Sequence, residues 1–194
     1  MNKLDTKTRQ KQILDASLNL IKEGGIQNLT MKRISQKVGI SEQAIYRHFR
    51  NKQDILCTII SHFNNHFEAV FESVKKIEVI EDRIQAFMDG HLNYFQANPA
   101  TAAVIFSEEI FQYDSTLAQK VNELVERRIA VITKFVESAQ AQGKFKPGLN
   151  PEDLAYIFLG SLRFLVTTWR LGGFKYNIRV RGESMKSTIL QLIK

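Results

Sequence analysis

The helical spacing of apolar residues is the feature that most limits how this chain can fold. No run of alternating apolar and polar residues flanked by turn residues occurs in the 194 residues, and only three prolines and ten glycines interrupt the pattern. Half-buried strands need that alternation, whereas helices need apolar residues three and four positions apart. We therefore predict an all-α protein, long enough for one large domain or two small ones that share a core.

The first 50 residues predict three helices, at residues 7–23, 31–37 and 42–48, of which the second and third are short. Thr30 and Ser41 precede the second and third helices as N-cap residues, and Gly39 allows a tight turn between them. Two short helices joined by such a turn form a helix-turn-helix. The first helix must supply apolar surface to them, because helices this short are not stable alone.

The later segments also show helical spacing, and we expect helices at residues 52–74, 81–97, 100–112, 115–142, 152–171 and 182–194. Pro151 suits the first position of the helix at 152–171, with Asn150 as its N-cap. The expected organisation is an N-terminal three-helix DNA-binding domain at residues 1–51, together with the start of the helix at 52–74. A C-terminal helical domain for effector binding and dimerisation would occupy residues 52–194.

The net charge of +7 is concentrated near the N-terminus. Residues 1–54 hold 11 Lys and Arg against 5 Asp and Glu, a local charge of +6, and the other 140 residues carry only +1. A basic segment joined to a nearly neutral body indicates an anionic partner, most often nucleic acid or a membrane surface. A solvated basic face that keeps the protein soluble would give the same count.

The helix expected at 42–48 separates apolar and polar side chains onto opposite faces. At about 100° per residue, Ile45 and Phe49 share one direction, and Gln43 and Arg47 lie opposite them, one turn apart. Gln can pair with adenine and Arg with guanine in the major groove, while a small methyl group can touch thymine. We therefore expect base contacts from four residues of this helix: Gln43, Arg47, Ala44 and Glu42.

Hydroxyl and cationic groups around this helix are placed to bind the DNA backbone. The residues expected to contact phosphate oxygens are Thr30, Lys32, Ser41, Tyr46, His48 and Lys52. A helix that simply faces solvent could carry the same residues. The local charge of +6 and the turn at Gly39 favour double-stranded DNA as the partner.

The block TMKRISQKVGISEQAIYRHFRNKQDIL, at residues 30–56, resembles the helix-turn-helix of TetR-type transcriptional repressors. The family pattern, in outline T-x-x-x-I-A-x-x-x-G-V-S-x-x-x-L-Y-x-H-F-x-x-K-x-x-L, is matched by Thr30, Ile34, Gly39, Ser41, Tyr46, His48, Phe49, Lys52 and Leu56. Ser35 stands where alanine is usual, and Ile40 and Ile45 are conservative replacements. The motif covers about 50 of the 194 residues and fixes many identities, whereas the remaining chain resembles the family only in length and helical layout.

Two residues depart from the usual pattern of the family. Gln43 stands where many relatives have glycine, which adds a side chain able to read a base. Glu42 stands where many relatives have a basic residue, and its charge would repel phosphates. Glu42 would therefore contact a cytosine amino group or point to solvent.

The resemblance implies a homodimeric repressor that a small effector releases from a palindromic operator. It also implies an effector pocket among the central helices, and the many aromatic residues there favour an apolar or aromatic effector. The candidate lining residues are Phe67, Phe71, Phe87, His91, Phe95, Phe106, Phe135 and Trp169. Each of them could instead simply fill a helical core. The helix at 52–74 touches both halves, so its tilt is the expected link between effector and DNA.

The helix at 152–171 is apolar on more than one face, which suits burial against a second subunit as well as its own core. With residues 182–194 it resembles the two helices that each family member contributes to a four-helix dimer interface. The expected interface residues are Leu154, Ile157, Phe158, Leu162, Leu165, Ile189 and Leu192. One buried central helix in a monomer is the alternative.

Other functions have weaker support. His62 and His66 are spaced to chelate a metal, but no cysteine or carboxylate set accompanies them, so we expect no metal and no cofactor. Cys57 could sense redox state, although its apolar neighbours favour a buried, inert thiol. An enzyme with a helical pocket lacks a visible nucleophile–base pair or phosphate loop. A module that binds a membrane surface or a partner protein through its basic segment is the other alternative.

We expect a soluble, cytoplasmic protein with no membrane partner. No apolar run approaches the roughly 18 residues that a membrane span needs. Residues 1–12 lack the apolar segment of a signal peptide. The single cysteine excludes an intramolecular disulfide and fits a reducing compartment.

Overall fold

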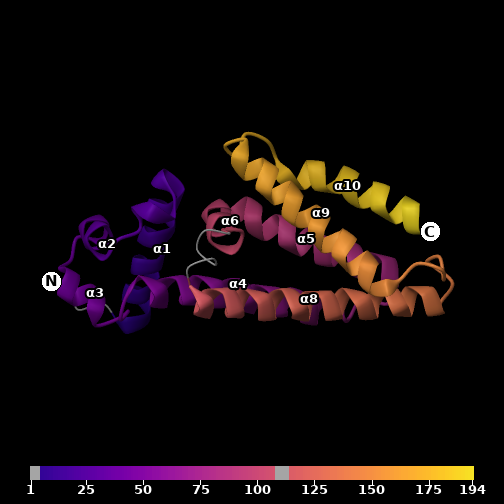
Figure 1. Ribbon diagram of the computed structural model, residues 1–194, viewed down its shortest axis with the longest axis horizontal. Helices are drawn as coiled ribbons and strands as arrows, with labels where there is room; N and C mark the ends of the chain where they lie inside the picture. The colour runs from indigo at the N-terminus through magenta and orange to yellow at the C-terminus, as the bar shows by residue number, and fades with distance from the viewer. Residues whose placement is uncertain (1–4, 108–113) are drawn as a thin grey trace. The chain divides into compact units, whose positions relative to one another are not determined.

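The computed structural model describes residues 5–107 and 114–194 (Figure 1). Their helices are α1 (Thr6–Gly24), the 3₁₀ turn η1 (Ile26–Asn28), α2 (Met31–Val38), α3 (Glu42–Tyr46), α4 (Lys52–Val74), α5 (Ile80–Ala97), α6 (Pro99–Ile105), α8 (Ser115–Ala141), α9 (Pro151–Leu171) and α10 (Ile178–Ile193). These two described ranges contain no strand. The predicted all-α fold is confirmed.

The helix-turn-helix is built by the capping residues that the sequence indicated. The Thr30 side chain accepts a hydrogen bond from the Arg33 amide at 3.2 Å, and that of Ser41 accepts one from the Ala44 amide at 3.2 Å. Gly39 lies between the two helices with φ 75° and ψ 36°, a left-handed conformation that favours glycine. The two caps and the turn fix where α2 ends and α3 begins.

Three helix boundaries differ from the prediction by two residues or more. Helix α3 ends at Tyr46, because the next residues form a turn in which the His48 amide donates to the Ile45 carbonyl at 2.8 Å. Helix α10 begins at Ile178, four residues early, since the side chain of Asn177 caps it. The helix expected at 100–112 begins as α6 and ends at Ile105. Residues 108–113 of that expected helix, and residues 1–4 of the expected N-terminal domain, lie outside the described residues.

The chain forms two compact units, and each is assembled from two stretches of sequence. Unit 1 comprises residues 1–63 and 99–120, and unit 2 comprises residues 64–98 and 121–194. In unit 1, helix α1 packs against α2 and α6. Its core includes the fully buried side chains of Ile13, Ile34, Ile45 and Ile55. Helices α4 and α8 each begin in unit 1 and end in unit 2.

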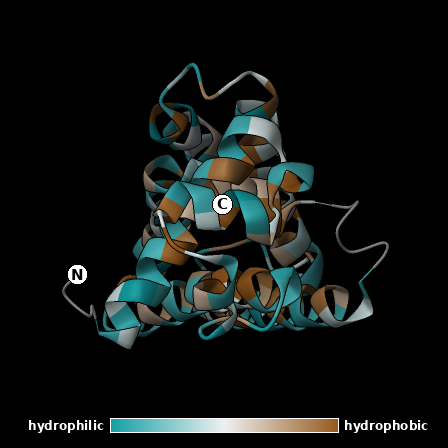
Figure 2. Ribbon diagram, turned by 90° about the vertical axis from the view of Figure 1, so that its left-hand side faces the viewer, coloured by the Kyte–Doolittle hydropathy of each residue, from teal (hydrophilic) through white to brown (hydrophobic). Residues whose placement is uncertain are grey.

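Unit 2 is held together by α5, α9 and α10, which pack against one another in pairs (Figure 1). Asn150 caps α9 by accepting from the Glu152 amide at 2.8 Å, and Pro151 occupies its first turn, as predicted. Gly182 lies inside α10 where a Cβ atom would overlap Leu92, so glycine lets α10 lie close to α5. Figure 2 shows hydrophobic and hydrophilic residues side by side along the helices, as expected for amphipathic helices around a core.

In the parts of the chain that the structure describes, we find no helix both long and apolar enough to span a membrane.

Candidate DNA interface and effector region

Helix α3 buries one face and exposes the other. Ile45 and Phe49 are buried in unit 1, whereas Gln43 and Arg47 are exposed. Tyr46 is half exposed. The arrangement leaves an amide, a guanidinium and a phenol on one accessible surface. Glu42 is exposed beside them, and Ala44 is partly buried at their edge.

The residues expected to contact phosphates surround α3, and several already make contacts within the chain. The hydroxyl oxygens of Thr30 and Ser41 act as helix caps, and the hydroxyl hydrogen of each can still be donated outward. The Lys52 ammonium donates to the Ile26 carbonyl at 3.0 Å, which ties the start of α4 to η1. Lys32 is exposed. The Nδ1 atom of His48 is buried and has no hydrogen-bond partner among the described residues.

Some cationic side chains of unit 1 are neutralised by ion pairs within the chain, and others are not. Lys11 pairs with Asp15 at 2.6 Å, and Lys37 pairs with Glu23. Lys32, Arg33 and Arg47 take part in no ion pair within the described ranges. Their charge is therefore available to an external anion. Arg33 was missed as a phosphate candidate, although its place in the first turn after the Thr30 cap was a usable signal.

Five of the eight residues expected to line an effector pocket come together in unit 2. The ring centroids of Phe67 and Phe87 are 4.9 Å apart, and the His91 ring lies 4.8 Å from Phe67 and 4.7 Å from Phe87. Phe135 lies 6.3 Å from Phe87 and 6.0 Å from Phe71. We call these five residues the aromatic cluster: Phe67, Phe71, Phe87, His91 and Phe135.

The other three pocket candidates lie elsewhere. Trp169 is buried in unit 2, where its Nε1 donates to the Tyr176 carbonyl at 2.7 Å and its ring meets Phe174 edge-on. Phe95, on α5, packs beside Tyr94. Phe106 belongs to unit 1 and is half-buried.

A buried arginine lies against the aromatic cluster. Arg128, on α8, is 6% exposed, and its guanidinium carbon lies 3.9 Å from the centroid of the Phe67 ring. Burial lowers the pKa of Arg128 to about 10, and the nearby Glu68 carboxylate partly opposes that shift. Arg128 was missed in the sequence. The usable signal was its register, since it is the charged member of a buried stripe that includes Leu124 and Ile132.

His91 is a neutral member of the aromatic cluster. Burial, together with the positive charge of Arg128, lowers the pKa of His91 to about 3. Its Nδ1 lies 2.9 Å from the Phe87 carbonyl, which can only accept, so Nδ1 carries the proton. The imidazole is therefore uncharged at neutral pH and packs as an aromatic ring.

The histidine pair proposed as a possible metal site is divided between the units. His62 is exposed in unit 1, and His66 stacks on Tyr94 in unit 2, with ring centroids 4.6 Å apart. Within residues 5–107 and 114–194, no three His, Cys, Asp or Glu side chains are placed to hold a metal ion. Cys57 is half-buried, and burial raises the pKa of its thiol.

The side chains expected at a dimer interface fall into two groups. Five of them are buried within this chain: Leu154, Phe158, Leu162, Leu165 and Ile189. Ile157 and Leu192 are exposed, and so are other apolar residues on the same helices, including Phe164 at 70% and Val180 at 69%. Gly160 is also exposed on α9, and a Cβ atom there would meet nothing within 4 Å. Helix α9 thus carries an exposed apolar face, defined by Ile157, Gly160 and Phe164, and α10 exposes the apolar side chains of Val180 and Leu192.

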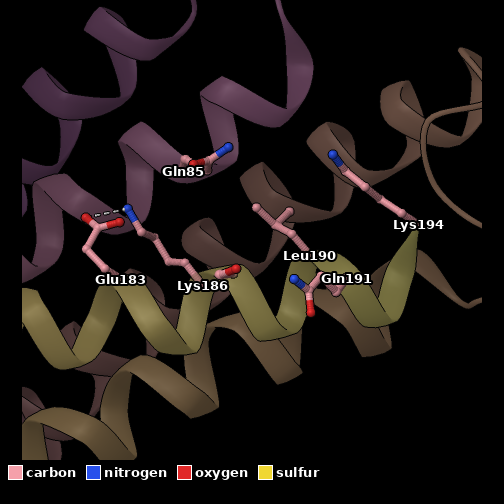
Figure 3. A pocket seen from close by; sticks show the side chains of 7 residues that line it. Gln85, Glu183, Lys186, Leu190, Gln191 and Lys194 are labelled. Atoms are coloured by element: carbon pink, nitrogen blue, oxygen red, sulfur yellow. Dashed lines mark hydrogen bonds and ion pairs between the residues drawn. The ribbon is translucent and has the colours of Figure 1, made fainter.

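A polar pocket of about 220 Å³ lies along α10 in unit 2 (Figure 3). Its lining is Gln85, Glu183, Lys186, Ser187, Leu190, Gln191 and Lys194. Lys186 is almost fully buried, and its ammonium pairs with Asp89 of α5 and with Glu183 at 3.0 Å. The Lys194 ammonium lies 3.8 Å from the Glu81 carboxylate. These charges are paired between α5 and α10, so we assign them to stabilising the packing of α10 against α5.

Two family models match successive parts of the sequence. A family model described as bacterial regulatory proteins of the tetR family matches residues 13–57. A second model, described as the C-terminal region of YsiA-like protein, matches residues 59–192. The chain is 24% identical over 183 residues to the fatty acid metabolism regulator protein of Bacillus subtilis (strain 168), which covers 94% of this chain and 92% of that protein.

Two solved structures share the fold. The fatty acid degradation regulator FadR from Bacillus halodurans has a TM-score of 0.83 at 20% identity, covering 98% of this chain and 97% of that chain. The regulator FadR from Bacillus subtilis, in complex with stearoyl-CoA, has a TM-score of 0.80 at 23% identity, covering 95% and 99%. These relatives are named as regulators rather than enzymes. The resemblance seen in residues 30–56 is confirmed, and the chain belongs to the TetR family of bacterial transcriptional regulators.

Proposed function

We propose that this regulator is a homodimeric repressor that binds a palindromic operator through α3 and is released by an effector with a long apolar part. It would act in the cytoplasm, where operators are accessible. The observation that carries the DNA-binding part is the capped helix α3, which exposes Gln43 and Arg47 opposite the buried Ile45 and Phe49. A helix fixed on one side and polar on the other is what major-groove reading needs.

Base reading is assigned to the exposed face of α3. Gln43 would pair with adenine and Arg47 with guanine, since each side chain can make two hydrogen bonds to its base. Ala44 would touch a thymine methyl group. Glu42 would accept from a cytosine amino group or stay in solvent, because its charge opposes contact with phosphate.

Phosphate binding is assigned to the hydroxyl and cationic groups around α3, to which we add Arg33. The hydroxyls of Thr30, Ser41 and Tyr46 can donate to phosphate oxygens, and so can the ammonium of Lys32 and a ring N–H of His48. Lys52 would act in part through the chain itself, because its contact with the Ile26 carbonyl positions the start of α4. Backbone amides at the start of α2 add donors and a positive dipole end.

Dimerisation is assigned to the exposed apolar face of α9, together with the exposed apolar side chains of α10. Phe164 and Val180 would otherwise remain in water, and exposed apolar patches of this kind mark interaction surfaces. Gly160, which has no side chain, would let the α9 helices of two subunits cross closely. Two recognition helices could then enter successive major grooves roughly 34–36 Å apart.

The effector is proposed to be a fatty acyl-CoA or a molecule with a similar apolar chain. The name of the Bacillus subtilis fatty acid metabolism regulator and the solved complex of Bacillus subtilis FadR with stearoyl-CoA support this class. The aromatic cluster supplies apolar surface in unit 2, and Arg128 supplies a cation beside it. An effector that binds better to a dimer with misplaced α3 helices would shift the population away from the DNA-competent state. The tilt of α4 would carry that change.

The test begins with duplexes that the full-length chain selects from random DNA. We expect a palindromic consensus, binding as a dimer, and weaker operator binding when stearoyl-CoA is added. Recovery of no consensus would overturn the DNA-reading assignment. An operator affinity indifferent to a panel of acyl-CoA chain lengths would overturn the effector class.

A pair of variants on α8 tests the polar side of the effector site. Arg128→Gln should reduce the response to stearoyl-CoA, whereas Lys134→Gln, at an exposed position of the same helix, should keep it. Equal responses from the two variants would remove Arg128 from the assignment. Binding of the operator without effector serves as the check that both variants are folded.

A further inference from the structure

Within unit 1, the first turn of α4 is bonded to the start of α8. The side-chain nitrogen of Gln53 lies 2.9 Å from both carboxylate oxygens of Asp114. Asp114 also caps α8, because its Oδ1 accepts from the Leu117 amide at 3.1 Å. Hydrogen bonds to an ionised acceptor are stronger than those between neutral groups. The pair is half-buried, which reduces competition from water.

The two helices joined by this pair are the two that pass from unit 1 into unit 2. Both begin in unit 1, near Gln53 and Asp114, and both continue into unit 2. In unit 2 they meet again, where Glu68 pairs with Arg127 at 3.8 Å and the ring of Phe71 lies 6.0 Å from that of Phe135. Helices α4 and α8 therefore run in the same direction and contact each other in both units.

The first turn of α4 is also anchored to the helix-turn-helix side of unit 1. The Lys52 ammonium donates to the Ile26 carbonyl, and the Asp54 carboxylate accepts from the Arg50 amide at 3.0 Å. A displacement that reaches the start of α4 is thus passed to the segments on either side of α2 and α3. The same displacement must either move Asp114 together with Gln53 or break the hydrogen bonds between them.

We propose that the Gln53–Asp114 pair is the positioning contact through which unit 2 controls the DNA-binding unit, an inference that rests on the proposed repressor function. While the pair holds, α4 and α8 enter unit 1 as one body and their starts cannot slide past each other. An effector that moves α4 relative to α8 in unit 2 would therefore act on the helix-turn-helix as a whole. Without the pair, the same motion would be absorbed by local slippage at the start of α4.

Cys57 is a native reporter for this contact. It is the only cysteine of the chain and lies one turn after Gln53 on α4. Its thiol is half-buried and senses the charges of Lys120 and Asp114, which lie at the start of α8. Opening of the α4–α8 contact in unit 1 should expose Cys57, so its rate of alkylation by iodoacetamide measures that opening without any effector.

The experiment compares Gln53→Ala with Gln12→Ala in the full-length dimer. Gln12 is an exposed glutamine of α1 in the same unit, and its side chain bonds only the neighbouring Arg9 among the described residues. Gln53→Ala should speed alkylation of Cys57 about 10-fold, the factor expected for losing one hydrogen bond to a charged group. It should also reduce, by at least about 5-fold, the protection from hydrogen exchange that operator DNA gives to residues 121–141. Gln12→Ala should change neither readout.

A donor–acceptor exchange separates positioning from mere stabilisation. Gln53→Glu alone places two carboxylates together and should act like Gln53→Ala. Gln53→Glu combined with Asp114→Asn restores one donor and one acceptor, keeps a side chain that can cap α8, and should restore both readouts. If wild type binds its selected operator and Gln53→Ala matches it in both readouts, the proposal is wrong. Failure of the wild type to select any operator would instead overturn the proposed function, and the alkylation rates would still decide whether the contact holds.

Discussion

The two compact units place their polar groups in opposite ways. In unit 1, the groups proposed to bind DNA, Gln43 and Arg47, are exposed above an apolar core. In unit 2, Arg128 and Lys186 are at most 6% exposed, and His91 is buried among aromatic rings. A surface that reads DNA must keep its polar groups solvated until contact. Buried charges and rings instead respond to whatever ligand or proton reaches the core. The stability of unit 2 should therefore depend on packing and pH, and the function of unit 1 on surface chemistry.

The largest expected effect comes from a substitution that disrupts the packing of unit 2. Phe87 is fully buried and contacts Phe67, His91 and Phe135 through its ring. Phe87→Ala should lower the free energy of unfolding by about 3–5 kcal/mol, because it removes apolar contact and leaves a cavity. Urea denaturation followed by circular dichroism measures the loss. Val125→Ala, on an exposed position of α8, is the control and should stay within about 0.5 kcal/mol. A loss for Phe87→Ala no larger than that control would contradict a packed aromatic cluster.

The second effect is a dependence on pH that His91 should give to unit 2. Its pKa is about 3 in the folded chain, far below the ordinary value, so between pH 6.5 and 3 the unfolded chain binds a proton that the folded chain does not. Stability should be complete above about pH 6.5 and fall by about 1.4 kcal/mol per pH unit as the pH drops below it. By about pH 5 the loss from this group approaches roughly 2 kcal/mol.

His91→Phe should reduce the fall in the free energy of unfolding between pH 7 and pH 5, the acid limb of the stability curve. The exposed His62 provides the matched control, since His62→Phe removes a histidine without removing a buried neutral ring. An acid limb with the same slope in wild type and His91→Phe would show that other groups cause it.

Much of unit 1 could be predicted from the sequence because its structure is specified locally. Thr30, Gly39 and Ser41 each act within four residues of their own position, through a cap or a left-handed turn. The orientation of α3 follows from the spacing of Ile45 and Phe49 alone. Such features depend only on neighbours in the chain, so they can be predicted without knowing the fold.

Unit 2 was predicted only as helices, because its important contacts join distant residues. Lys186 is buried by pairing with Asp89, 97 positions away, and Gly182 is needed only because Leu92 lies against it. Arg128 reads as one of two adjacent arginines until the fold places it over Phe67. The apolar face of α9 was recognised, but which of its residues face inward depends on how α5 and α10 pack. No periodicity within one helix contains that information.

The third effect should appear in the surface chemistry of unit 1 and leave its stability unchanged. Gln43→Ala should weaken binding to the selected operator by about 1–3 kcal/mol and relax specificity at one base position. Lys32→Ala should weaken binding to operator and random DNA alike and reduce the slope of log K against log salt by about one. Equal losses on operator and random DNA for Gln43→Ala would contradict direct base reading by that residue.

The smallest effect tests whether α3 is fixed before DNA arrives. The helix has only five residues, and the side chain of Ser41 accepts from one of the amides in its first turn, that of Ala44. Ser41→Ala should lower the free energy of unfolding by about 1 kcal/mol, and Ser41→Asp should restore it, because aspartate caps as well as serine. Aspartate also adds a negative charge beside the proposed phosphate contacts, so Ser41→Asp should recover stability without recovering operator affinity. Thermal unfolding and operator titration of the same two variants separate these roles. If Ser41→Asp recovered both quantities, Ser41 would serve α3 only as a cap, and its assignment to phosphate binding would have to be withdrawn.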